Sequence, residues 1–187
     1  MKILFASDIH GCLPAAERIW AVADAVQPDA IVVLGDALYH GPRNPLPEGY
    51  DPKQVAALLN CRKNRIIAVR GNCDSEVDQM LIEYPMMGDF AWVLVDGKRL
   101  FLTHGHKSSP ASLPPLADGD VFVYGHTHIP KAEKKVHADS GGLVHIWNPG
   151  SCSLPKDGYQ ASYGLLADGI FCVCAMDGTV LLEDALW

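Results

Sequence analysis

The N-terminal third of the chain alternates short apolar runs with amphipathic stretches. Apolar runs over residues 2–6 and 30–34 flank residues 13–26, in which apolar side chains recur at helical spacing. A second helix is predicted over residues 51–59, where an aspartate precedes a proline, and a third strand over residues 65–69. The order strand, helix, strand, helix, strand predicts parallel strands with helices packed outside them.

After a short helix predicted over residues 75–82, the pattern changes to strands joined by tight turns. The hairpin dipeptide Asp-Gly stands between apolar runs at Asp96, Asp168 and Asp177. The predicted strands cover residues 90–95, 98–103, 121–124, 131–136, 143–147, 162–167, 170–176 and 179–182. So many strands with so few helices predict an α/β fold, with two mixed sheets face to face and helices on the outer sides. We find no repeat or linker and expect one domain over residues 1–187.

Composition and charge exclude several classes of protein. A hydrophobic fraction of 49% with 20% charged residues is typical of a globular domain. The net charge of −7 repels polyphosphate backbones, which argues against a general nucleic-acid binder. The first apolar run is too short for a signal peptide or a membrane span, so we expect a cytoplasmic protein without a membrane partner and with its six cysteines reduced.

Polar residues that can bind metal stand where the predicted strands end. Asp8 and His10 follow the first strand, two residues apart on a segment expected to be extended, which would point both to one side. Further candidates follow four other strands: Asp36, Asn72, His104, and the pair His126 and His128. Singly, each motif is explained as well by a turn or a packed histidine. Five strand ends that all carry such residues favour a shared ligand site, because ligands gather beyond the carboxyl ends of strands in α/β sheets.

In this order the motifs resemble those of the calcineurin-like metallophosphoesterases, D-x-H, GD, GN, a middle H and GHxH, over nearly the whole chain. The sequences around Gly35-Asp36 and Arg70-Gly71-Asn72-Cys73-Asp74 are similar to those of small bacterial phosphodiesterases of the YfcE type. The resemblance implies a four-layer αββα sandwich with a two-metal centre at the strand ends. It implies that one ion is held by Asp8, His10 and His128, the other by Asn72, His104 and His126, and that Asp36 bridges both.

The donor set of this implied centre contains carboxylate, amide and imidazole groups and no thiolate. Such a set suits Mn²⁺, which we expect first, as well as Zn²⁺, Fe²⁺, Co²⁺ or Ni²⁺. A hydroxide shared by two such ions would attack a phosphodiester in line, with Asp36, Asn72 and His104 in direct catalytic roles. The resemblance thus implies the activity of a phosphoric diester hydrolase acting on a small phosphodiester.

One position departs from the commonest family pattern. Many members carry a histidine after the Gly-Asn motif that orients substrate or protonates the leaving group, whereas this chain has Cys73. Since general-acid help is worth about 10²–10⁴ in rate, its loss predicts a preference for good leaving groups. Asp74 is expected either to orient an imidazole or to cap the following helix. His40, Arg43 and His106 are the remaining candidates for contacting substrate or supporting the ligands.

Two alternatives stay open at this point. The chain could hydrolyse phosphomonoesters or phosphoproteins with the same chemistry, or serve as a non-catalytic scaffold on the same fold. The presence of all seven candidate ligands favours catalysis. A homo-oligomer is possible, since composition does not separate an exposed apolar patch from core.

Overall fold

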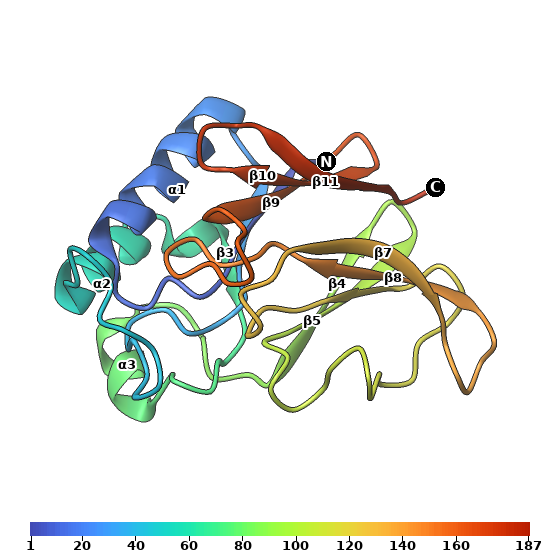
Figure 1. The fold of residues 1–187 in the computed structure, drawn as a ribbon, viewed down its shortest axis with the longest axis horizontal. Helices are drawn as coiled ribbons and strands as arrows, with labels where there is room; N and C mark the ends of the chain where they lie inside the picture. The colour runs from blue at the N-terminus through green and yellow to red at the C-terminus, as the bar shows by residue number, and fades with distance from the viewer.

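The computed structural model describes residues 1–187 as two mixed β-sheets that face each other (Figure 1). One sheet has six strands in the order β11-β10-β9-β1-β2-β3, and the other has five in the order β4-β5-β6-β8-β7. The pairs β1–β2, β2–β3, β5–β6 and β6–β8 are parallel, and the other neighbours are antiparallel. The predicted fold class, α/β with two mixed sheets, is confirmed.

The strands lie close to their predicted positions. The six-stranded sheet contains β1 (Ile3–Ala6), β2 (Ala30–Val33), β3 (Ile66–Ala68), β9 (Ser162–Ala167), β10 (Ile170–Ala175) and β11 (Val180–Ala185). The five-stranded sheet contains β4 (Phe90–Val95), β5 (Lys98–Thr103), β6 (Val121–Val123), β7 (Lys131–Val136) and β8 (Leu143–Asn148). The largest shift is in β11, which begins and ends later than the predicted 179–182.

The three helices lie close to their predicted ranges. They are α1 (Leu13–Val26), α2 (Pro52–Asn60) and α3 (Glu76–Leu81), with a 3₁₀ turn at Lys63–Arg65. The Asp51 side chain accepts a hydrogen bond from the Gln54 amide at the start of α2, as predicted. Ser75, rather than Asp74, caps α3, in a reciprocal capping box with Asp78. The first two helices lie together against the six-stranded sheet, where the Trp20 indole donates to the Leu58 carbonyl.

The space between the sheets is filled by apolar side chains from both. The Trp147 and Phe171 rings stack with centroids 4.3 Å apart, and Phe5 meets Phe171 edge to face. Buried hydrogen bonds cross the same interface, since the Asp184 carboxylate of β11 accepts from the side chains of His145 and Trp147 of β8. These contacts hold the two sheets in a fixed relation, so residues that follow strands of both sheets are positioned against one another.

The outer layers differ from the expectation of helices on both sides. Helices cover the six-stranded sheet, whereas the outer face of the five-stranded sheet is covered by residues 104–120, which contain no helix. Leu116 of this segment belongs to the same buried apolar cluster as Phe122 and Ile146. Three prolines in the segment, Pro110, Pro114 and Pro115, remove backbone donors and so prevent a helix there.

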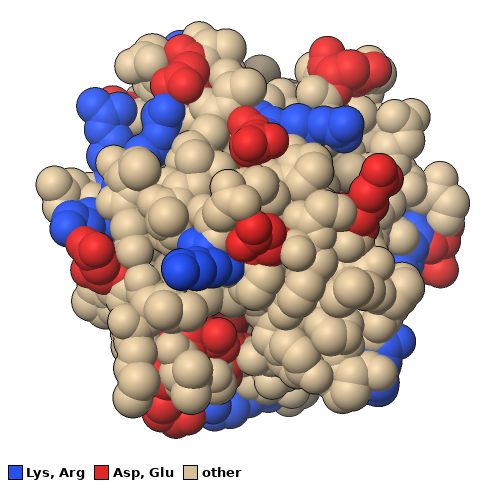
Figure 2. Space-filling model, turned by 90° about the vertical axis from the view of Figure 1, so that its left-hand side faces the viewer, with Lys and Arg blue, Asp and Glu red and all other residues tan.

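The structure also bears on the expectations about cysteines, membrane-spanning helices and surface charge. All six cysteines are free thiols in the structure. No helix has both the length and the apolar character that a membrane crossing requires. Figure 2, which looks onto the side that carries the helices, shows acidic and basic side chains scattered among uncharged ones rather than in one basic patch.

Candidate metal centre

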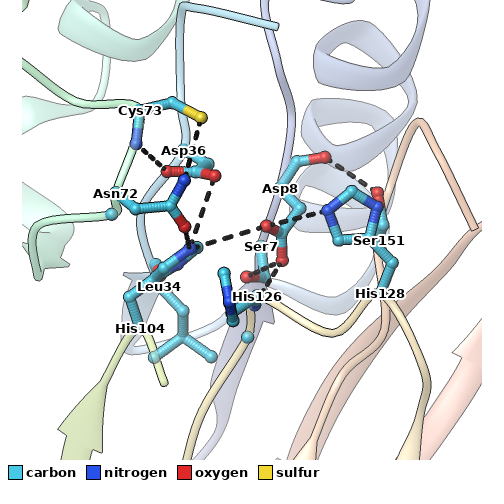
Figure 3. A network of polar contacts seen from close by, with 12 residues as sticks. Ser7, Asp8, Leu34, Asp36, Asn72, Cys73, His104, His126, His128 and Ser151 are labelled. Atoms are coloured by element: carbon cyan, nitrogen blue, oxygen red, sulfur yellow. Dashed lines mark hydrogen bonds and ion pairs between the residues drawn. The ribbon is translucent and has the colours of Figure 1, made fainter. Parts of the chain in front are cut away.

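The candidate ligands come together at one edge of the two sheets (Figure 3). Asp8, Asp36 and Asn72 follow the parallel strands β1, β2 and β3, and His104 and the His126–His128 pair follow the parallel strands β5 and β6. Parallel strands end at the same edge of a sheet, and the two sheets face each other, so residues up to 120 positions apart in sequence converge.

The backbone at these strand ends is turned rather than extended. The prediction that Asp8 and His10 lie on an extended segment is wrong, since both residues have positive φ angles, 55° and 51°. Three more of the seven candidates share this conformation: Asp36, His126 and His128. Non-glycine residues rarely adopt it, and such strain concentrates at functional sites. The side chains converge through tight turns that the strand pattern does not reveal.

Two glycines permit the close approach of the turns. A Cβ atom on Gly71 would lie 2.0 Å from Asp36 Oδ1, and one on Gly125 would lie 2.0 Å from Ser7 Oγ. Either contact is far shorter than real side chains allow. The glycines of the Gly-Asn and Gly-His motifs therefore serve to bring neighbouring strand ends together around the carboxylates of Asp8 and Asp36.

Backbone carbonyls orient three of the imidazoles. The Nδ1 atoms of His10, His104 and His128 each lie at hydrogen-bond distance from a carbonyl oxygen, so each Nδ1 carries the proton and donates it. The carbonyls belong to Tyr39, Leu34 and Leu154, at 2.8, 2.6 and 2.5 Å respectively. In the neutral rings the Nε2 lone pairs then point into the site, which is the orientation of a histidine ligand.

The atoms inside the site are almost all acceptors. Oδ1 of Asp8 is buried without a hydrogen-bond partner, 3.3 Å from Nε2 of His128 and 3.7 Å from Nε2 of His10. Those two Nε2 atoms are themselves 3.3 Å apart. On the other side, Nε2 of His104 lies 3.1 Å from Oδ1 of Asn72 and 3.4 Å from Oδ2 of Asp36. Lone pairs that face one another at such distances require protons or cations between them, so the residues fit divalent metal.

Charge within the site shifts the pKa values of its groups. Burial alone would raise the pKa of Asp8 and Asp36, but the neighbouring imidazoles lower both below the usual range. Burial alone would lower the pKa of His104, but Asp36 and Asp8 raise it to about 9. Burial lowers the pKa of His10 and of His126. Without metal at neutral pH, His104 therefore holds a proton where a cation would otherwise lie.

Asp74 has neither of the two roles expected from the sequence. Its carboxylate accepts hydrogen bonds from the backbone amides of Gly71, Asp36 and Ala37, at 2.7, 2.9 and 3.0 Å. It contacts no imidazole and does not cap α3. Instead it ties the turn after β3 to the turn after β2, and thereby places Asp36 beside Asn72. Burial and the Asp36 charge raise the pKa of Asp74 to about 6.

A polar hollow of about 450 Å³ opens beside these ligands. Arg43 and Cys73, two of the candidates for contact with substrate, line it. The other two candidates do not: the His40 ring packs between Tyr39 and Tyr50. The ring of His106 lies against those of His104 and His126, with centroids 5.4 and 6.3 Å away.

The sequence pattern did not identify several residues that line this hollow or that hold the turn at Asp8. Thr127 and Lys156 line the hollow. The hydroxyls of Ser151 and Ser153 donate to the Asp8 carbonyl, at 2.8 and 2.9 Å, and so hold its turn. Thr127 could have been found from its place between His126 and His128, whereas the serines and Lys156 lie in a loop without a ligand-type pattern.

Comparison with known proteins agrees with this geometry. Residues 1–167 match the calcineurin-like phosphoesterase superfamily domain. The chain is 50% identical to phosphodiesterase YfcE of Escherichia coli K12, covering 100% of this chain and 98% of that protein. It is 28% identical to phosphodiesterase MJ0936 of Methanocaldococcus jannaschii, over 81% of this chain and 84% of that protein.

The fold agrees as closely as the sequence. A solved structure of YfcE, a phosphoesterase from E. coli, superposes with a TM-score of 0.95 at 49% identity over 100% of both chains. The family match over most of the chain, the identity to YfcE and the shared fold lead to one conclusion. This chain belongs to the calcineurin-like phosphoesterase superfamily.

Proposed function

We propose that this protein is a metal-dependent phosphodiesterase that hydrolyses small phosphodiesters. The observation that carries the proposal is the cluster of buried acceptors, in which Asp8 Oδ1 has no hydrogen-bond partner and faces imidazole Nε2 atoms. A charged oxygen buried in this way is costly unless a cation neutralises it. The family and this cluster imply a divalent metal, and the 50% identity to a phosphodiesterase supports the reaction.

Seven side chains would hold two ions, in the arrangement that the resemblance implies. Asp8, His10 and His128 would hold one, Asn72, His104 and His126 would hold the other, and Asp36 would contribute to both. Mn²⁺ is the expected metal, with Zn²⁺, Fe²⁺, Co²⁺ or Ni²⁺ as alternatives. When bound, such ions would supply positive charge to the phosphate and lower the pKa of a water nucleophile. That charge would attract a phosphodiester anion despite the net charge of −7.

The remaining polar groups of the hollow serve to hold the substrate. Arg43 and Lys156 are exposed cations on two different loops, and neither forms an ion pair within the chain. The guanidinium of Arg43 can bind two phosphate oxygens at once. Backbone amides and carbonyls fix the Asp8, Asp36 and imidazole side chains beforehand, so binding of the ester requires little rearrangement of the ligands.

The direct test compares esters that share a leaving group. Turnover of an aryl phosphodiester and of the corresponding aryl phosphomonoester is measured with Mn²⁺-loaded protein. We expect kcat/KM for the diester to exceed that for the monoester by at least about tenfold, or about 1.4 kcal/mol of transition-state stabilisation, because the relative at 50% identity is a phosphodiesterase. Faster hydrolysis of the monoester would favour the phosphatase alternative, and no hydrolysis of either would favour the scaffold.

A second prediction concerns the leaving group. Burial and the nearby Asp36 carboxylate raise the pKa of the Cys73 thiol above its usual range, so the thiol is a poor proton donor. Cys73→His should raise kcat/KM for alkyl phosphodiesters by about 10-fold or more and for aryl diesters by much less, because only alkoxides need the proton. Initial rates on paired alkyl and aryl substrates measure this. Equal gains on both would remove any leaving-group role for the position.

The other expectations from the sequence remain predictions. A cytoplasmic location, a single domain and a possible homo-oligomer fit a protein of this kind, as does the expectation that it is not a general nucleic-acid binder. Size-exclusion chromatography with light scattering measures the oligomeric state directly.

A further inference from the structure

A second, larger hollow adjoins the polar one. It has a volume of about 810 Å³ and lies between the loop that follows β2 and the helices α2 and α3. Four residues line both hollows: Pro42, Arg43, Asn72 and Cys73. A group bound at Asn72 therefore has open space on the far side of Cys73, and the two hollows form one continuous binding surface.

The larger hollow is apolar where the first is polar. Leu38, Tyr39 and Tyr50 line it on the loop side, and Val77 and Leu81 line it on α3. Tyr39, Val77 and Leu81 are 41%, 65% and 46% exposed. Large apolar side chains of this kind contribute little to the core, and their grouping in a hollow beside a reactive centre is typical of a ligand pocket.

The charged side chains that line this hollow do not repel an anionic ester. Lys53 and Arg43 line it, and neither forms an ion pair within the chain. The one acidic side chain in the lining, Asp78, is engaged by the amide and hydroxyl of Ser75 in the capping box of α3. An ester whose phosphate lies at the metal centre can thus extend an uncharged group into the hollow without meeting a free carboxylate.

We propose that this hollow binds an aromatic substituent of the phosphodiester, with the ring against Tyr39 and Tyr50 and its outer edge on Val77 and Leu81. The inference rests on the proposed function, since it takes the metal centre as the phosphate site. Two tyrosines in the lining favour a flat ring over an aliphatic group, because aromatic pairs gain more than their buried area alone provides. The enzyme would therefore select diesters by one organic substituent as well as by the phosphate.

Binding of phosphonates separates this pocket from catalysis, because a P–C bond is not hydrolysed. Dissociation constants of methyl-, cyclohexyl- and phenylphosphonate are measured by calorimetry with Mn²⁺-loaded protein. Phenylphosphonate should bind at least about 10-fold more tightly than methylphosphonate, as expected for burial of one ring. The affinity for phenylphosphonate should also exceed that for cyclohexylphosphonate by about 3-fold or more.

Variants of α3 supply a matched comparison. Val77→Ser and Leu81→Ser should each reduce the phenyl-to-methyl ratio about 3-fold or more, and Tyr39→Leu should remove the preference for phenyl over cyclohexyl. Met80→Ser is the control, because Met80 lies on the same helix, is 82% exposed and does not line the hollow. All of these side chains are exposed, so the substitutions leave the core intact.

Each outcome separates the two proposals. Equal affinity for methyl- and phenylphosphonate would overturn the aromatic pocket and leave the phosphodiesterase proposal standing. A phenyl preference that Val77→Ser, Leu81→Ser and Met80→Ser all leave unchanged would also overturn it. If no phosphonate binds while Mn²⁺ is bound, the phosphate site itself is misplaced and the proposed function fails with it.

Discussion

Asp36→Asn should lower kcat/KM for an aryl phosphodiester by about 10³-fold or more. The substitution removes one negative charge from the point where both groups of candidate ligands meet, and an ion lost there costs several kcal/mol of transition-state stabilisation, with each factor of ten equal to about 1.4 kcal/mol. An amide oxygen can still accept the hydrogen bond that the Cys73 amide donates to Asp36 Oδ1 at 2.8 Å. The turn after β2 should therefore persist.

Metal content and stability distinguish this effect from misfolding. The variant should bind less than the wild-type amount of Mn²⁺ by elemental analysis, while its metal-free form unfolds within a few degrees of metal-free wild type. Asp177→Asn is a suitable control, because Asp177 also accepts a backbone amide, from Thr179, but lies in the exposed turn between β10 and β11. An Asp36→Asn protein with near-wild-type turnover would show that the metal centre does not require the Asp36 carboxylate.

Much of the fold follows from the local sequence. The cap of α2 needs only Asp51 and Pro52, and the tight turns that end at Gly97 and Gly169 follow from Asp-Gly dipeptides between apolar runs. Alternation and strand ends also place Asp8 and Asp36 at one edge, since parallel neighbours share their direction. These features depend on residues that are adjacent in sequence or joined by one crossover.

Features that depend on distant contacts were not predictable in the same way. Asp74 reads locally as a helix cap, yet its partners are the amides of Asp36 and Ala37, which the pairing of β2 with β3 brings near it. The positive φ of His10 arises because the turn after β1 pairs with residues 36 and 37. His40 lies near the candidate ligands in sequence, but its ring is held between two tyrosines instead.

Removal of metal should abolish activity and loosen the fold, and both effects should be reversible. Chelated protein should lose more than about 99.9% of its turnover and recover it with Mn²⁺. At a metal concentration of about 100 times the dissociation constant, binding stabilises the folded state by about 2.7 kcal/mol. For a chain of this length that corresponds to a rise in Tm of about 5–10 °C, measured by differential scanning fluorimetry. Full activity of the chelated protein would contradict a metal mechanism.

The affinity of the protein for metal should change with pH, in a direction that follows from the pKa of His104. In the metal-free protein the pKa of His104 is about 9, so from pH 7 to pH 8 the ring stays largely protonated and the metal must displace that proton. The affinity for Mn²⁺ should therefore rise with pH by up to about 10-fold per unit below pH 9, with release of a proton that calorimetry in buffers of different ionisation enthalpy detects. His10 and His126, whose pKa values burial lowers, are already neutral there and add no such dependence. A Mn²⁺ affinity that does not change between pH 7 and pH 8 would contradict displacement of a proton from Nε2 of His104 by the metal.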